Sequence, residues 1–182
     1  MKKTLTFITL LSFSVMLFSC GGKNDDPTPE PPAGESTWKL GNYTYTRGAS
    51  AQNVAGSTVG IAVTTSGNGG NHGAYSGSAL TAVFNKALGA GTYTLTSTEV
   101  LAAHPTARYM MLSCTVGTAV ATGAVDYSAT ATSGGTADVT IDANGQYHIN
   151  ISNPVTLVKS TVVGGGIPGA PGTYTLTVKN AY

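Results

Sequence analysis

The sequence predicts an all-β fold: an antiparallel β-sandwich of about eight or nine strands, with a closed up-and-down β-barrel as the alternative. Three observations predict it. Apolar and polar residues alternate with a period of two along most of residues 37–182. Gly-rich turn sequences at 66–77, 117–124 and 163–172 separate these runs. Finally, the strongest helical candidate, 97–107, contains Pro105, which limits it to a turn or two. Many short strands separated by such turns are typical of sandwiches and barrels.

Each strand is predicted by its own alternating run. In chain order the runs are 38–45, 58–64, 80–84, 92–96, 110–116, 138–142, 147–152 and 173–179. In the first run the alternation slips by one residue at Gly41–Asn42, which we interpret as a β-bulge. Val155 and Leu157 suggest a further strand after Pro154. Ala143–Asn144–Gly145, between two alternating runs, predicts a β-hairpin.

Composition excludes several classes of protein. The chain has 182 residues, of which only 9% are charged, and its formal net charge is +1. A nucleic-acid-binding protein of the ordinary kind needs clustered Lys and Arg, so we expect no nucleic-acid partner. A hydrophobic content of 41% disfavours charge-driven disorder, and 24 Gly residues exclude a long coiled coil.

The N-terminus has the pattern of a signal peptide. Met1–Lys3 form a short positive region, and residues 5–19 are apolar apart from scattered Ser and Thr. This stretch is shorter than the roughly 20 residues that span a bilayer. Residues 17–21 (LFSCG) resemble a bacterial lipobox. The resemblance implies that residues 1–19 are removed and that Cys20 is lipidated, which would anchor the protein to a membrane. A buried N-terminal helix is the alternative.

Residues 20–36 are predicted to form a flexible tether. Four prolines between positions 27 and 32 favour an extended chain, which could reach about 50 Å. With Asp25 and Asp26 just behind Cys20, the whole pattern resembles that of Bacteroidota-type surface lipoproteins. This resemblance implies an outer-membrane protein exported to the cell surface. An acidic, solvated linker is the alternative, and it leaves the inner or outer face of that membrane open.

The remaining residues, 37–182, are predicted to form a single all-β domain. Stretches 76–95, 134–157 and 172–182 are similar to small β-sandwich domains of such lipoproteins, which have no assigned activity. The resemblance therefore supplies no catalytic residues.

The residues of the domain that could perform chemistry are few and scattered. The three histidines have no zinc-site spacing, so we expect no metal and no cofactor. Asp138 and Asp142 are predicted to lie about 13 Å apart on one strand, too far for a glycosidase pair. Cys114 alternates with apolar residues and is expected to be a buried small hydrophobe. We therefore do not expect an enzyme.

The remaining hypothesis is a binding surface. Loop 66–77 offers Asn68, Asn71, His72 and Tyr75, and a tyrosine beside amide side chains can stack on a sugar ring. Loop 163–172 is a second long connection, although both loops could simply be mobile connectors. The predicted function is a non-catalytic, surface-exposed lipoprotein that binds a glycan, peptide or protein. The alternative is a structural or adhesive envelope subunit that assembles through strand edges. The oligomeric state stays open.

Overall fold

A computed structural model describes residues 36–65, 72–119 and 123–182. The predicted signal peptide, Cys20 and most of the tether lie outside this range. The described residues form one ten-stranded sheet. Its strands are β1 (Thr37–Leu40), β2 (Tyr43–Ala55), β3 (Thr58–Thr65), β4 (Ser78–Asn85), β5 (Gly91–Thr96), β6 (Tyr109–Ala119), β7 (Gly123–Ser128), β8 (Thr136–Ile141), β9 (Tyr147–Val163) and β10 (Thr173–Ala181). The helical elements are short: η2 (Gly73–Tyr75), η3 (Lys86–Leu88) and α2 (Thr98–Ala103).

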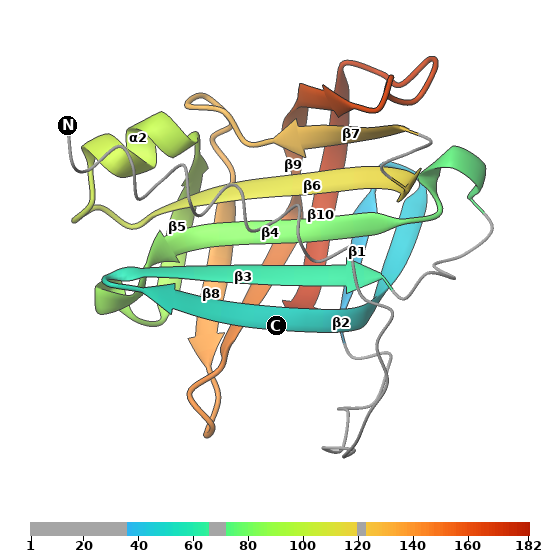
Figure 1. The fold of residues 1–182 in the computed structure, drawn as a ribbon. Coiled ribbons are helices and arrows are strands. Elements are labelled where there is room, and N and C mark those ends of the chain that lie inside the picture. The colour runs from blue at the N-terminus through green and yellow to red at the C-terminus, as the bar shows by residue number, and fades with distance from the viewer. Residues whose placement is uncertain (1–35, 66–71, 120–122) are drawn as a thin grey trace. The chain divides into compact units, whose positions relative to one another are not determined.

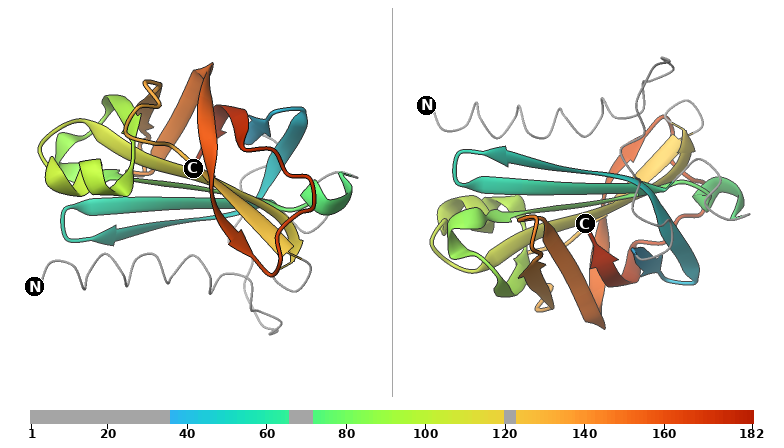
Figure 2. Two further views of the ribbon diagram at one scale, coloured as in Figure 1. Left: turned by 90° about the horizontal axis from the view of Figure 1, so that it is seen from above. Right: turned by 90° about the horizontal axis from the view of Figure 1, so that it is seen from below.

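The sheet folds into two layers. Strands β2, β3, β4 and β6 run across the front of Figure 1, and β8, β9, β10 and β1 run behind them at a steep angle. The views from above and below show the same separation of layers (Figure 2). Apolar side chains from both layers fill the space between them, as in two sheets packed face to face. The all-β prediction is confirmed.

Backbone pairing continues from one layer into the other. Strand β10 pairs with both β1 and β9, and β6 pairs with β4, β5 and β7. The long β9 pairs with β8 along its first residues and with β7 along its last. The order is not a simple up-and-down one, because β5 and β6 run parallel and are joined through α2. Every other pairing is antiparallel.

The alternating runs predict the core well. On β3, β4, β5 and β6 all the residues predicted to face inward are at most 2% exposed, and they include Cys114. A buried polar chain crosses between the layers here. The Trp38 indole N–H donates to Ser78 Oγ at 2.9 Å, and Ser78 Oγ lies 3.4 Å from Cys114 Sγ. Burial raises the pKa of the Cys114 thiol to about 12, so the protonated thiol, a poor nucleophile, prevails at neutral pH.

The bulge predicted at Gly41–Asn42 is wrong. These two residues form a tight turn between β1 and β2, and Leu40 pairs directly with Tyr43 across it. Gly41 has a φ of +57°, and a Cβ there would lie 2.7 Å from the Tyr174 ring. Glycine therefore satisfies both the backbone and the packing. A two-residue turn and a bulge shift the alternation by the same amount, which is why the pattern did not distinguish them.

Strand β2 is much longer than its alternating run. Its first residues pair with β1, and from Arg47 onward it pairs with β3. The register shifts between Arg47 and Ala49, so Gly48 lies at an irregularity where β2 leaves one layer and enters the other. Strand β7 is not among the predicted runs. The predicted turn 117–124 is too long, because β6 continues to Ala119 and β7 begins at Gly123.

Pro154 does not begin a new strand, because β9 continues through it. β9 advances from Ile151 to Val155 while β10 advances only from Val178 to Leu176. The extra β9 residues, Pro154 among them, leave the ladder as a bulge. Proline is tolerated at this position because a bulged residue does not need an N–H group for pairing.

The predicted helical turn and the predicted hairpin are both present. Helix α2 lies within the predicted 97–107 range, and residues 143–145 form the turn between β8 and β9. Among the described residues, no helix is both long and apolar enough to cross a membrane.

Candidate functional site

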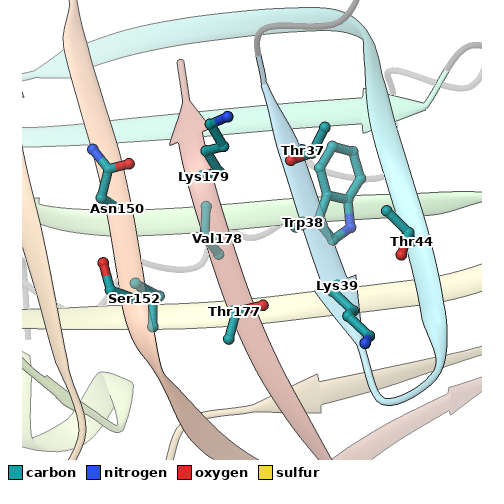
Figure 3. A pocket seen from close by; sticks show the side chains of 10 residues that line it. Thr37, Trp38, Lys39, Thr44, Asn150, Ser152, Thr177, Val178 and Lys179 are labelled. Atoms are coloured by element: carbon teal, nitrogen blue, oxygen red, sulfur yellow. The ribbon is translucent and has the colours of Figure 1, made fainter.

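A groove of about 320 Å³ lies on the layer formed by β9, β10, β1 and β2 (Figure 3). It is lined by Thr37, Trp38, Lys39, Thr44, Asn150, Ile151, Ser152, Thr177, Val178 and Lys179. We call it the lysine groove. Its side chains come from β1 and β2, at the start of the described domain, and from β9 and β10, near its end (Figure 3).

The alternation of the strands positions these side chains. Trp38, Ile151 and Val178 are at most 4% exposed and belong to the core, so their neighbours in sequence point outward. The outward set consists of lysines, hydroxyl side chains and one amide. The register shift between β9 and β10 lies beside Ser152. The groove is therefore a polar surface supported from behind by the core.

Two lysines supply the positive charge of the groove. Lys39 pairs with Thr177, and Lys179 pairs with Thr37, so the lysines are diagonal neighbours on β1 and β10. Diagonal neighbours across a ladder are about 7–8 Å apart. Figure 3 shows the two side chains pointing toward opposite ends of the groove, so their ammonium groups are placed to bind anionic groups at two separate positions along a ligand. No carboxylate is among the lining residues.

Asn150 closes the groove on the β9 side. Its Oδ1 accepts the backbone N–H of Asn180 at 2.9 Å, so its NH₂ group is the part of the amide suited to donate to a ligand. The nearest acidic strand position is Asp138, which pairs with Asn150 from β8. The Asp138 carboxylate accepts the Thr92 hydroxyl at 2.7 Å.

The predicted binding residues lie elsewhere, at the end of the domain that contains η2. Asn68 and Asn71 fall outside the described residues. His72 Nε2 lies 3.4 Å from the carbonyl oxygen of Thr44, a groove residue, and its ring packs edge-on against Tyr43. The Tyr75 ring stacks on Tyr43 with centroids 4.5 Å apart. The structure thus brings His72 and Tyr75 together over the start of β2.

Four tyrosines gather between η2 and the loop before β10. Tyr174 lies edge-on to Tyr43 and Tyr75, with centroids 6.2 Å away in each case, and 5.0 Å from Tyr127. The Tyr127 hydroxyl donates to the carbonyl oxygen of Pro171 at 3.0 Å. We call Tyr43, Tyr75, Tyr127 and Tyr174 the tyrosine cluster. It connects η2 with the loop before β10.

Two tyrosines of the cluster, Tyr127 and Tyr174, are poorly suited to acid–base chemistry. Burial raises the pKa of Tyr127 to about 12, and burial together with the Tyr75 hydroxyl raises the pKa of Tyr174 further above its ordinary value. These phenols are therefore neutral at physiological pH and serve as packing and hydrogen-bonding groups. Tyr43, Tyr75 and Tyr174 are only partly buried, so part of the cluster faces solvent.

A second polar network lies where β2 approaches the start of β9. The Asp142 carboxylate lies 3.3 Å from His148 Nε2, and His148 Nδ1 lies 2.9 Å from Asn180 Oδ1. The Tyr182 ring packs on His148 with centroids 4.4 Å apart, and Arg47 donates to the Tyr182 hydroxyl at 2.8 Å. His148 is partly buried, and each of its ring nitrogens has a polar partner.

Backbone amides account for much of the electrostatics of Asp142. Its Oδ1 accepts the N–H groups of Asn144 and Gln146 at 2.8 and 2.9 Å. The bond from Gln146 is the main reason that the pKa of this carboxyl lies below its usual range, and His148 adds to the effect. The network therefore holds the hairpin turn between β8 and β9 in place.

Within the described residues, no three His, Cys, Asp or Glu side chains gather closely enough to hold a metal ion.

The sequence analysis did not predict the lysine groove, although Lys39 and Lys179 both lie on the polar face of predicted strands. The missing information was that β1 and β10 are neighbours.

Comparison with protein-family models, with curated proteins and with solved structures gives no match to this chain.

Proposed function

We propose that this protein is a lipid-anchored, non-catalytic binding protein of the cell envelope, and that the lysine groove binds an acidic glycan. The N-terminal pattern around Cys20 supports the anchor, and the Pro-rich tether would hold the domain away from the membrane. The single observation that carries the binding proposal is the diagonal pair of Lys39 and Lys179 among outward-facing hydroxyls.

The chemistry of the groove matches an acidic sugar chain. Carboxylate or sulfate groups would accept charge-assisted hydrogen bonds from the two lysines. Sugar hydroxyls would bond to Thr37, Thr44 and Thr177, which can both donate and accept. An open groove on the outer face of the layer suits an extended chain, whose ends can pass beyond the lining residues.

Binding to arrays of acidic and neutral oligosaccharides, followed by calorimetric titration, tests this proposal. We expect acidic glycans to bind and the affinity to fall as the salt concentration rises. The Lys39→Gln, Lys179→Gln double variant should lose about tenfold or more in affinity, because it removes two charged donors. Lys86→Gln is the matched control, since Lys86 is an exposed lysine on η3 outside the groove.

Two results would contradict the proposal. One is the absence of binding to any acidic glycan above background. The other is an equal loss of affinity in Lys86→Gln, which would indicate attraction to the overall charge of the domain rather than to the groove.

A further inference from the structure

The second half of β2 has an unpaired backbone edge. Within Gly48–Ala55, residues Ala49–Ala55 pair with β3 on one side, and Gly48 precedes them at the irregularity. On the other side, pairing with β1 covers Tyr43–Thr46, and the last backbone bond runs from Arg47 N–H to the Ser36 carbonyl at 3.0 Å. Beyond it, no described strand pairs with this edge, which forms the lower border of the front layer in Figure 1.

This edge lacks the usual protection against pairing. Natural edge strands carry lysines, prolines, bulges or inward-pointing charges that prevent another strand from adding. Gly48–Ala55 reads GASAQNVA and contains no charge and no proline. The irregularity at Gly48 lies at the very beginning of the segment, so the rest of the edge is regular. An added strand would meet neither like charge nor a missing N–H.

Val54 gives this edge an exposed apolar side chain that a partner strand could cover. It pairs with Val59, which is fully buried, so the Val54 side chain points to the inner side of the layer. Its side chain is nevertheless 50% exposed, so the described residues cover the inner side only in part at this position. A strand added along the edge would carry its own inward side chains beside Val54 and remove part of this surface from water.

We propose that this edge is a self-association site, at which a second copy of the chain adds its own β2 in antiparallel orientation. The segment is complementary to itself, because it is uncharged and built from small side chains. A pairing centred on Gln52 would place Ala51 opposite Asn53 and Val54 opposite Ser50, so that no two charged side chains of the segment face each other. Equal length lets each copy satisfy the whole edge of the other, under a two-fold axis. The partner's β2 would extend the front layer of both copies into one sheet.

The N-terminal segment of the same chain fits this edge less well. Between residues 27 and 32 it carries four prolines, which cannot donate to a ladder. It also carries Asp25, Asp26, Glu30 and Glu35, which bring charge to an uncharged strand. A second copy provides a full set of donors and acceptors instead.

The test measures the association of the full-length protein over a concentration series by analytical ultracentrifugation. Ala51→Lys brings two like charges into the paired edge, and it should raise the dissociation constant of the dimer at least tenfold. Thr94→Lys is the matched control, because Thr94 is an exposed strand residue that already has partners on both sides. It should leave the dimer unchanged. Ala49→Lys provides a second edge variant if Ala51→Lys does not fold.

Amide hydrogen exchange identifies the edge directly. The amides in 48–55 that do not bond to β3 should exchange more slowly as the protein concentration rises, and this dependence should vanish in Ala51→Lys. A protein that stays monomeric at every concentration would overturn the proposal. A dimer that Ala51→Lys and Ala49→Lys leave intact would overturn it too, as would slow exchange of these amides in the monomer, which would mean that the chain covers its own edge.

Discussion

The two halves of β2 join the rest of the domain in different ways. The first half, Tyr43–Thr46, is continued into the other layer by backbone pairing with β1. The second half, Gly48–Ala55, reaches the other layer through side chains. The Gln52 amide donates to the Tyr147 carbonyl at 2.8 Å and accepts the Tyr147 N–H at 3.0 Å, so it takes the place of a paired residue.

Burial follows this difference. Tyr45 in the first half is fully buried, whereas Ser50 and Val54 on the inner side of the second half are exposed. A backbone ladder holds many residues at once and excludes water from the side chains behind it. Here we call the isolated side-chain contacts between the layers, such as those of Gln52 and Arg47–Tyr182, the side-chain seam. Each of these contacts joins the two layers at one point only. The first half should therefore contribute more to stability than the second.

The largest expected effect is on the ladder side. Trp38→Ala removes a fully buried ring that stacks on Tyr45 with centroids 5.7 Å apart and bonds to Ser78. We expect it to lower the free energy of unfolding by about 3–5 kcal/mol, measured by chemical denaturation. Lys39→Ala, on the same strand but exposed, should change it by less than about 0.5 kcal/mol. If both variants lower the free energy of unfolding by the same amount, the stabilising role of the buried face of β1 is contradicted.

The next effect is on the side-chain seam. Gln52→Ala leaves the backbone N–H and carbonyl of Tyr147 without their partner, which should cost about 1–3 kcal/mol. Gln52→Glu keeps an acceptor for the N–H but sets a carboxylate against the carbonyl, so it should also destabilise. Asn53→Ala, an exposed neighbour on the opposite face, is the control. A loss in Gln52→Ala as large as in Trp38→Ala would show that the two halves contribute equally.

The smallest effect concerns the pH dependence of the seam. The lowered pKa of Asp142 means that its charged form is favoured by folding. The resulting stability is present above the unfolded pKa of about 4 and is lost as the pH falls through the lower folded value. Asp142→Asn keeps the acceptor for the turn amides but removes the charge. Melting temperatures measured between pH 2 and pH 6 should therefore fall less steeply in the variant; an unchanged slope would contradict this role.

The alternating pattern predicted the strands whose two faces differ most. The predicted inward residues of β3 to β6 are buried because one face of each strand meets the core and the other meets solvent. The same rule failed for the second half of β2, where Ser50, Gln52 and Val54 share the inner side and no described element covers it fully. Burial there depends on how far the opposite layer extends, which no local pattern encodes.

The candidate site shows the same limit. The polar faces of the strands that carry Lys39 and Lys179 are evident in the sequence, but these residues are 140 positions apart. Their meeting depends on β1 pairing with β10. Likewise, the sequence singled out His72 and Tyr75 as loop residues, and the structure adds that Tyr75 packs against Tyr43 and Tyr174.

The sequence by itself determined the all-β class, the direction of most strand faces, the β8–β9 hairpin and the short helix. These features follow from side-chain period and turn chemistry within a few residues. Only the tertiary structure decided which strands pair with each other, the turn at Gly41–Asn42, the lysine groove and the unpaired edge of β2. Each of these depends on which distant strand lies alongside, and that choice follows from packing two whole layers around one core.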